Sequence, residues 1–284
     1  MAIVSIIVPC YNCGEYLSET LDSCLSQTFN DWECIIVNDG STDETEMISY
    51  HYLSKDNRFK YIAQNNQGPS AARNNGIQVS TGNYILPLDG DDCLCPCCLQ
   101  EAIAHFKSNP SAKIVCWDEE LFGARSGIRK LPQYNWERFI WDNCIRSCSM
   151  FKRTDYDKTR GYDESMRTGL EDWDFWLSLL RKDDVIVHID KALFRYRIRD
   201  VSMTSQVKRN ALTIMRRIYL NHPEIYSQFS LDIISAKNES LMWQDAYFDC
   251  LNKLKAIQES KAYVLGQLFL KPFRWVKKFF KSKR

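Results

Sequence analysis

The stretch YILPLDGDD, residues 84–92, joins an apolar run to three carboxylates. Its first part, Tyr84–Leu88, has the length and composition of a strand that is buried on both faces of a sheet. Asp89 and Asp91 follow directly. In extended backbone, residues i and i+2 face the same way, so both carboxylates are expected to point into one site. Two neighbouring carboxylates suit Mg²⁺ or Mn²⁺, although an Asp-Gly pair is equally typical of a tight turn.

The segments before this stretch alternate between the patterns of strands and helices. The strands are β-branched apolar runs, and the helices carry apolar residues at intervals of three and four. Ser41 and Glu44 have the spacing of a capping box, which predicts the start of a further helix. This alternation is typical of an α/β fold with a doubly wound, mostly parallel sheet. The expected strands are Ile3–Val8, Glu33–Val37 and Phe59–Ala63, and the expected helices are Glu15–Gln27 and Pro69–Val79.

The second half of the chain has a less regular pattern. Asp118–Asn143 lacks clean periodicity and is interpreted as a loop-rich insertion, and the chain is expected to be helical from Val207 onward. Between them we expect helices at Cys97–Lys107 and Glu171–Arg181, and strands at Ala112–Trp117, Val185–Ile189 and Ala192–Tyr196.

Two further acidic positions are candidates for function. Parallel sheets bind ligands at the carboxyl ends of their strands, where Asp39 lies, although Asp is also a common turn and cap residue. Glu171 and Asp172 lie in the first turn of a predicted helix, where the helix dipole favours acids. The same field would keep Asp172 ionised, as a general base must be. Trp173 offers a face on which a sugar ring can stack, or it fills the core.

Composition excludes several classes of protein. Hydrophobic residues make up 45% and charged residues 26%, which is typical of a globular protein and not of a disordered or collagen-like one. No stretch reaches the roughly 18 apolar residues that span a bilayer, and the first residues lack a secretory pattern. We therefore expect a cytoplasmic protein whose 12 cysteines remain thiols. The clustered cysteines at positions 10, 13, 93, 95, 97 and 98 leave a structural zinc site as the less favoured alternative.

Six motifs, taken in order, resemble the family 2 glycosyltransferases. The resemblance runs from about Ile3 to Ser205 and implies a GT-A fold with inverting sugar transfer from a nucleotide-sugar. It divides residues 1–205 into a nucleotide-sugar half, about 1–117, and an acceptor half, about 118–205, followed by a helical extension at 206–284. The motifs are SIIVPCYN, CIIVNDGSTD, SAARNNGI, TGNYILPLDGDD, GLEDWDFWLSL and YRIRDVSMT.

The resemblance implies roles for the donor-binding residues. Pro9, Tyr11 and Asp39 match positions that hold the base, most often uracil of a UDP-sugar, with Tyr11 stacking on it. Arg73 would contact the nucleotide. Asp89 would contact the ribose.

It also implies the catalytic apparatus. Asp91 would bind Mn²⁺ or Mg²⁺ that bridges the diphosphate, and Asp172 would be the catalytic base, with Glu171 and Trp173 on the acceptor side. Many relatives carry histidine in the last motif where this chain has Arg199, which cannot ligate metal but can pair with phosphate oxygens. The processive signature QxxRW is absent, which favours transfer of a single sugar.

The near-neutral formal charge of +1 conceals an uneven distribution. The last 24 residues hold 8 Lys and Arg and no acid, so residues 1–260 carry 29 basic (37 less 8) and 36 acidic groups. The tail at 264–284 combines this charge with an aromatic apolar face, which is typical of a helix on an anionic membrane surface. A packing or partner-binding helix is the alternative.

Together these features predict a peripheral enzyme at the inner face of the cell membrane. It would transfer a sugar to a glycan or lipid-linked acceptor in the synthesis of surface polysaccharide or glycolipid. The alternative from another class is a catalytically silent nucleotide-sugar binding module. Nucleic-acid binding is not expected, because the excess of basic residues is confined to the tail.

Overall fold

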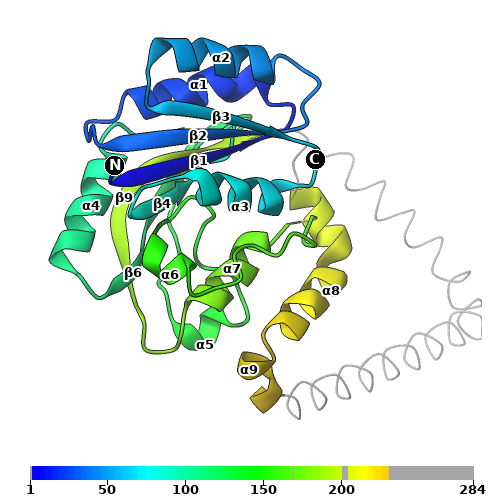
Figure 1. The fold of residues 1–284 in the computed structure, drawn as a ribbon. Coiled ribbons are helices and arrows are strands. Elements are labelled where there is room, and N and C mark those ends of the chain that lie inside the picture. The colour runs from blue at the N-terminus through cyan, green and yellow to red at the C-terminus, as the bar shows by residue number, and fades with distance from the viewer. Residues whose placement is uncertain (1, 168, 200–203, 230–284) are drawn as a thin grey trace, which may run out of the picture. The chain divides into compact units, whose positions relative to one another are not determined.

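The computed structural model describes residues 2–167, 169–199 and 204–229. The chain forms two compact units, residues 1–223 and residues 224–284. Of the second unit, the described part comprises most of a short helix, α9 (Pro223–Tyr226), and a 3₁₀ turn at Ser227–Phe229. The rest of the fold lies in the first unit (Figure 1).

A parallel sheet forms the first half of the chain. Its strand order is β3-β2-β1-β4, and the central strands β1 and β2 are β-branched apolar runs with both faces covered. Every residue of β2 is buried, and so is every residue of β1 except Pro9, which is half-buried. The predicted α/β class with a mostly parallel sheet is confirmed. The strands are β1 (Val4–Cys10), β2 (Trp32–Asp39), β3 (Phe59–Gln64) and β4 (Tyr84–Pro87).

The second half extends the same sheet with mixed pairing. β8 lies antiparallel between β4 and β6, β6 pairs in parallel with β9, β5 pairs with the far side of β9, and β7 forms a hairpin with β6. The bounds are β5 (Cys93–Leu94), β6 (Ala112–Gly123), β7 (Gly127–Arg129), β8 (Met150–Lys152) and β9 (Val185–Ile198).

Two expectations for this half were wrong. The start of the predicted loop-rich segment, residues 118–123, continues β6, because the charged Asp118 and Glu119 are buried in ion pairs and so break the apolar pattern without breaking the strand. The two short strands predicted over 185–196 are one strand. Asp190 and Lys191 fall at an irregularity in its pairing with β6, which the sequence pattern shows as a gap.

Helices cover both faces of the sheet. α1 and α2 lie on one face, where Leu17, Leu21 and Tyr52 join the core cluster that contains Val4 and Ile6 (Figure 1). α3 lies on the opposite face. The helices are α1 (Gly14–Leu25), α2 (Thr45–Lys55), α3 (Pro69–Val79), α4 (Cys98–Ser108), α5 (Trp136–Phe139), α6 (Arg153–Tyr156), α7 (Glu171–Leu179) and α8 (Thr204–Asn221).

A helix begins after β2 as predicted, but the predicted capping box does not form. Asp43 Oδ1 accepts a hydrogen bond from the Thr45 backbone N–H at 3.1 Å, so Asp43 serves the start of α2. The Ser41 hydroxyl instead accepts a hydrogen bond from the Asn12 N–H at 3.0 Å, and it thereby joins the loops after β1 and β2.

The described helices include none that is both long and apolar enough to cross a membrane. The chain after residue 229 was predicted to be helical, with a membrane-binding tail at 264–284. These positions lie outside the described residues.

Gly76 sets how closely α3 approaches the sheet. A Cβ atom there would lie 2.6 Å from Ile7 Cγ2 and 2.9 Å from Val37 Cγ2, closer than side-chain atoms tolerate. Because α3 also carries Arg73, this contact fixes the depth at which that side chain enters the molecule.

Replacing Gly76 with alanine should therefore destabilise the protein, although alanine favours helix. Overpacking destabilises a protein by ~1–3 kcal/mol, and the higher helix propensity of alanine stabilises it by up to ~1 kcal/mol. We therefore expect the free energy of unfolding to fall by about 1 kcal/mol. Urea denaturation measures it. Val79→Ala, at an exposed position of the same helix, is the control and should change stability by less than ~0.5 kcal/mol. A Gly76→Ala protein as stable as the parent would contradict the packing described.

Candidate active site

A cavity of about 420 Å³ opens where β1, β2 and β4 end. It brings together side chains from the loops after these strands, from α3, from the first turn of α7 and from the end of β9. Eight of the ten residues singled out in the sequence line it, and Asp172 and Trp173 are the two that do not. The eight are Pro9, Tyr11, Asp39, Arg73, Asp89, Asp91, Glu171 and Arg199.

The Arg73 guanidinium connects three parts of this site. Its Nη2 lies 2.7 Å from Asp89 Oδ1 and its Nη1 lies 2.7 Å from Glu171 Oε1, while the side chain is only 3% exposed. Burial acts to lower the pKa of Arg73, but the two carboxylates outweigh it and hold the pKa above its usual value. The side chain predicted to contact nucleotide is therefore first a buried counter-ion that ties α3, the loop after β4 and α7 together.

The residues after β4 form a tight turn, which the Asp92 N–H closes on the Asp89 carbonyl at 3.0 Å. The prediction of extended backbone was wrong, yet Asp89 and Asp91 both reach the cavity. Gly90 is required between them, because a Cβ atom there would lie 2.7 Å from Cys13 Sγ. The sequence left a tight turn and a carboxylate site as alternatives. In the structure the turn itself brings both carboxylates to the cavity.

Arginines of β9 and the residue after it hold the turn in place. Arg199 Nη2 pairs with Asp91 Oδ2 at 2.9 Å, and the Arg197 N–H and Nε donate to Asp92 Oδ1 and the Asp91 carbonyl, each at 2.8 Å. Burial, and secondly the Asp89 carboxylate, raise the pKa of Asp91. A cation at this position is therefore electrostatically favoured.

The residues predicted to hold the base line the cavity. The Tyr11 ring is 56% exposed, which leaves a face available for stacking. Asp39 is buried, and its carboxylate accepts hydrogen bonds from the Gln64 side chain at 2.7 Å and from the Gln67 and Gly68 N–H groups at 2.8 Å each. Asp39 thus also fixes the loop between β3 and α3.

Asp172 lies beside the cavity, in the first turn of α7. Its Oδ1 accepts a hydrogen bond from the Trp173 N–H at 2.8 Å and its Oδ2 accepts one from Asn143 Nδ2 at 3.1 Å. Burial, and then the Glu171 carboxylate, raise the pKa of Asp172 to about 6. Asp172 is thus mainly ionised at pH 7 and is a stronger proton acceptor than an ordinary aspartate.

The structure corrects the acceptor-side assignments of the two neighbours of Asp172. Trp173 is 2% exposed and its indole N–H donates to the Phe139 carbonyl at 2.9 Å, so it packs in the core and has no face for a sugar. Glu171 turns toward Arg73 and lines the cavity. The helical spacing of apolar residues could not predict where these two side chains lie, because both faces of α7 are buried.

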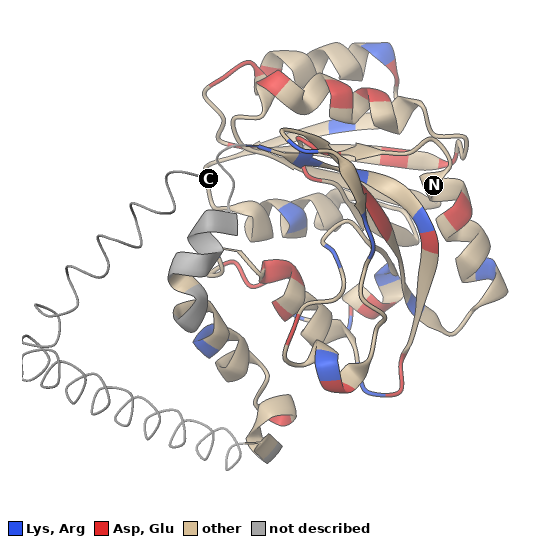
Figure 2. Cartoon of the chain, turned by 180° about the vertical axis from the view of Figure 1, so that it is seen from behind, with Lys and Arg blue, Asp and Glu red and all other residues tan. Residues whose placement is uncertain are grey.

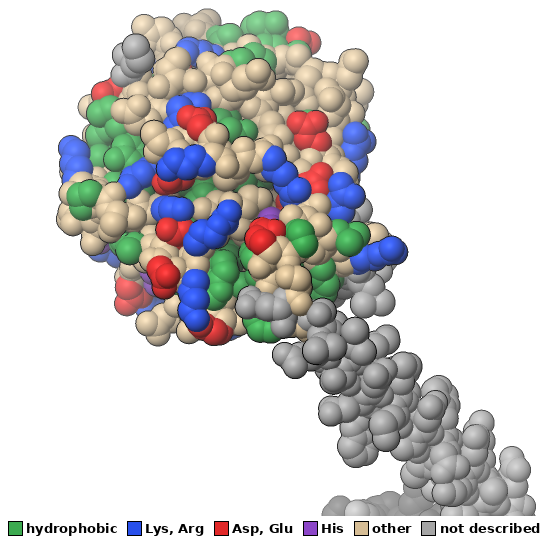
Figure 3. Space-filling view, turned by 60° about the horizontal axis from the view of Figure 1, so that its bottom comes forward, with side chains coloured by type: hydrophobic (Ala, Val, Ile, Leu, Met, Phe, Trp, Pro, Cys, Tyr) green, Lys and Arg blue, Asp and Glu red, His purple; other side chains and the backbone are tan. Residues whose placement is uncertain are grey.

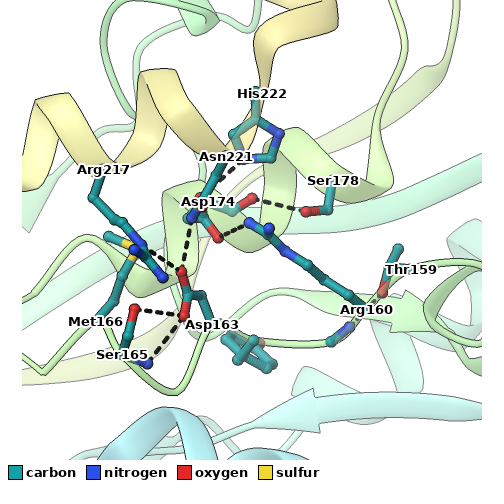
Figure 4. Close-up of polar contacts among 12 residues, drawn as sticks. Thr159, Arg160, Asp163, Ser165, Met166, Asp174, Ser178, Arg217, Asn221 and His222 are labelled. Atoms are coloured by element: carbon teal, nitrogen blue, oxygen red, sulfur yellow. Dashed lines mark hydrogen bonds and ion pairs between the residues drawn. The ribbon is translucent and has the colours of Figure 1, made fainter.

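A second polar cluster anchors α7 (Figure 4). Asp174 is fully buried, and its carboxylate pairs with Arg160 Nη2, Asn221 Nδ2 and His222 Nε2, each at 2.9 Å. Asn221 also donates to Asp163 at 2.8 Å. The end of α8 therefore fixes the helix that carries Asp172 through Asp174, in addition to the Glu171–Arg73 pair.

Other cavity residues were not anticipated as site residues. Cys10 and Cys13 contribute thiols, and Asn66, Gly68 and Arg167 line the wall near α3. Of these residues, only Gly68 could have been noticed in the sequence, because it precedes Pro69 at the start of a helix. Its φ is 94°. Each of the eleven cysteines within the described ranges is a free thiol.

Charges of both signs are interspersed beyond the site. Basic and acidic positions adjoin in the middle of the sheet (Figure 2) and on the face drawn in Figure 3. Arg195, for example, lies 3.4 Å from Glu120 and 3.6 Å from Glu19. In the described part of the chain, many basic side chains thus lie next to acidic ones.

Residues 5–160, more than half of the chain, match the family model "Glycosyl transferase family 2". The chain belongs to the family 2 glycosyltransferases. Among curated relatives, the Bacillus subtilis glycosyltransferase EpsE is 32% identical over 205 residues, which cover 68% of this chain and 72% of EpsE. B. subtilis EpsJ is 31% identical over 71% of this chain and 63% of its own length.

Other similarities cover a smaller share of the matched protein or are more distant. The Escherichia coli chondroitin synthase is 31% identical over 62% of this chain but only 26% of its own length. A crystal structure of S. aureus TarS residues 1–349 with UDP-GlcNAc superposes with a TM-score of 0.65 at 24% identity, over 78% of this chain and 66% of that one. A Pyrobaculum calidifontis mannosyltransferase with GDP-Man and Mn²⁺ gives 0.59 at 15% identity, over 94% and 83%. The predicted GT-A-like fold is confirmed.

Removing the Arg73 cation should destabilise this glycosyltransferase in a pH-dependent way. In Arg73→Met the buried Glu171 carboxylate loses its counter-ion, at a cost of ~3–5 kcal/mol when it is ionised. Burial and the Glu171 carboxylate raise the pKa of Asp172 to about 6, and Arg73 acts to lower it, so the loss of Arg73 should raise that pKa further. The destabilisation should therefore be larger at pH 8 than at pH 5, where protonation relieves it.

Chemical denaturation at the two pH values measures this difference. Arg138→Met, which breaks the exposed Arg138–Asp142 pair, is the matched control, with an expected effect below ~1 kcal/mol at either pH. A loss for Arg73→Met that is equally small would show that the buried bridge does not support the fold.

Proposed function

We propose that this protein is an inverting glycosyltransferase that moves one sugar from a UDP-sugar to a hydroxyl group of a glycan or lipid-linked acceptor. The observation that carries the proposal is the convergence of strand-end carboxylates and Tyr11 on one cavity, with Asp172 beside it. Related folds have been crystallised with UDP-GlcNAc and UDP, which supports a nucleotide-sugar donor.

The donor would lie along the carboxyl ends of the strands. Tyr11 would stack on the base, with Pro9 and Asp39 holding its edge. Asp89, which is 34% exposed beside the buried Arg73, would accept a hydrogen bond from the ribose. Arg73 orients that carboxylate and adds positive charge near the nucleotide.

The residues present fit a divalent cation. Asp91 supplies hard carboxylate oxygens in a cavity where Asp89 is a second negative charge, and Mg²⁺ and Mn²⁺ are commonly held by one or two carboxylates together with substrate phosphates. When bound, the metal supplies Lewis-acid stabilisation of the leaving diphosphate. Arg199, now paired with Asp91, can contribute a guanidinium to the same phosphate oxygens.

Asp172 would remove the proton from the acceptor hydroxyl as that oxygen attacks the anomeric carbon on the face opposite the diphosphate. Asn143 holds one carboxylate oxygen, which restricts the orientation of the base. A single displacement inverts the anomeric configuration.

The acceptor would belong to surface polysaccharide or glycolipid synthesis. The relative that carries the name chondroitin synthase supports a polysaccharide acceptor. The basic tail at 264–284 would bring the enzyme to the anionic inner face of the membrane, where lipid-linked acceptors reside.

Asp172→Asn should retain UDP binding but lower the rate of sugar transfer by ~10²–10⁴-fold, the usual contribution of a general base. In the parent enzyme kcat/KM should rise with pH up to about 6 and then level off, because only the ionised carboxylate accepts the proton. Transfer or hydrolysis of radiolabelled UDP-sugars measures both.

Asp183→Asn, at an exposed acid beyond the end of α7, is the control and should leave rate and pH profile unchanged. Near-normal transfer by Asp172→Asn would remove the base assignment. A parent chain that binds UDP without any transfer or hydrolysis would instead support the silent binding module.

Asp91→Asn should abolish the effect of metal on donor binding. In the parent enzyme Mn²⁺ should tighten UDP binding by ~10-fold or more, since a charge-assisted contact is worth ~1.5–3 kcal/mol, and the variant should lose this gain. Isothermal titration calorimetry with and without Mn²⁺ provides the comparison. Asp31→Asn, an exposed acid before β2, should behave as the parent, and an undiminished Mn²⁺ effect in Asp91→Asn would contradict the metal assignment.

A further inference from the structure

Two arginines outside the donor cavity share one buried carboxylate. Glu119 of β6 is 1% exposed, and its Oε2 accepts a hydrogen bond from Arg129 Nε while its Oε1 lies 3.2 Å from Arg146 Nε. The two arginine side chains are 35% and 34% exposed. Neither lines the donor cavity.

This arrangement leaves positive charge at the surface. Two guanidiniums face one carboxylate, so the group has a net charge of +1. Both arginines approach Glu119 through Nε, and among the described residues their Nη groups make no hydrogen bond. Because Glu119 is buried and contacts both arginines through Nε, it orients the two guanidiniums with their Nη groups available to a ligand.

The pair lies near the loop that positions the base. Arg146 is in the same loop as Asn143, which donates to Asp172 at 3.1 Å. Arg129 lies over the Tyr196 ring, 5.0 Å from its centroid, and is joined to Arg146 through Glu119. A molecule that presents a hydroxyl to Asp172 from outside the donor cavity would therefore come close to these guanidiniums.

We propose that Arg129 and Arg146 form a subsite for an oxyanion on the acceptor, a carboxylate or a phosphate near the hydroxyl that receives the sugar. The planar guanidinium fork matches both groups. That the ligand is an acceptor rests on the proposed function, whereas the anion subsite itself rests on the geometry. The donor diphosphate has its own cations, Arg73 and Arg199, in the cavity.

The test uses matched pairs of small ligands with the full chain, first saturated with UDP to fill the donor cavity and then without UDP. The first pair is methyl β-glucuronide and methyl β-glucoside, which differ by a carboxylate. The second pair is glucose 6-phosphate and glucose. Titration followed by NMR should show at least ~10-fold tighter binding of one or both charged members, and Arg146→Gln should remove that preference.

Arg125→Gln removes an exposed positive charge from the same β6–β7 hairpin and is the control. It should change the affinity for the charged ligands by less than ~2-fold. If Arg146→Gln fails to fold, judged by circular dichroism, Arg129→Gln carries the same prediction with Glu119 left paired to Arg146.

A preference for the glucuronide identifies a carboxylate, and one for the sugar phosphate identifies a phosphate. Equal binding of charged and neutral members, or equal losses in Arg146→Gln and Arg125→Gln, would overturn the subsite. If UDP does not bind but the charged ligand binds in an Arg146-dependent way, the subsite stands and the proposed function fails.

Discussion

The site depends on one buried guanidinium. Arg73 lies between Asp89, which follows β4, and Glu171, which opens α7, with 2.7 Å contacts to each. A buried cation is tolerated only with such partners, and Glu171 in turn cannot be buried as a carboxylate without it. The donor-facing turn and the helix that carries Asp172 are therefore held in one geometry by a mutual requirement for charge neutralisation. The close approach of α3 at Gly76 sets where that cation sits.

Other carboxylates also have basic partners from other segments of the chain. Asp91 pairs with Arg199, Asp92 with the backbone of Arg197, and Glu119 with Arg129 and Arg146. Asp91 and Glu119 thus each have a basic partner from a different segment of the chain. Arg199 is the most exposed of these basic partners, whereas Arg73 is enclosed. The enclosed Arg73 therefore maintains the geometry of the site, whereas the exposed Arg199 is free to change its partner.

Much of this could be predicted from local patterns. The β-branched runs gave the strands of the first half, and the acids after them were placed correctly at the cavity, because strand ends meet at one edge of a parallel sheet. What failed depended on distant partners. The strand at 118–123 was hidden by acids whose basic partners lie in other segments of the chain. Trp173 was assigned to a ligand although the Phe139 carbonyl accepts its N–H. The family resemblance predicted that Arg73 contacts the nucleotide. Its pairing with Glu171, 98 residues away, could not be predicted from the neighbouring sequence.

In the proposed mechanism, an oxygen nucleophile activated by Asp172 displaces the diphosphate in one step from the opposite face. Proton NMR can identify the anomer of the first sugar released when the full chain hydrolyses an α-linked donor, UDP-N-acetylglucosamine, and it needs no knowledge of the natural acceptor. We expect the β-anomer to form first and then to equilibrate with the α-anomer. Initial release of the α-anomer would contradict a single displacement and the role given to Asp172.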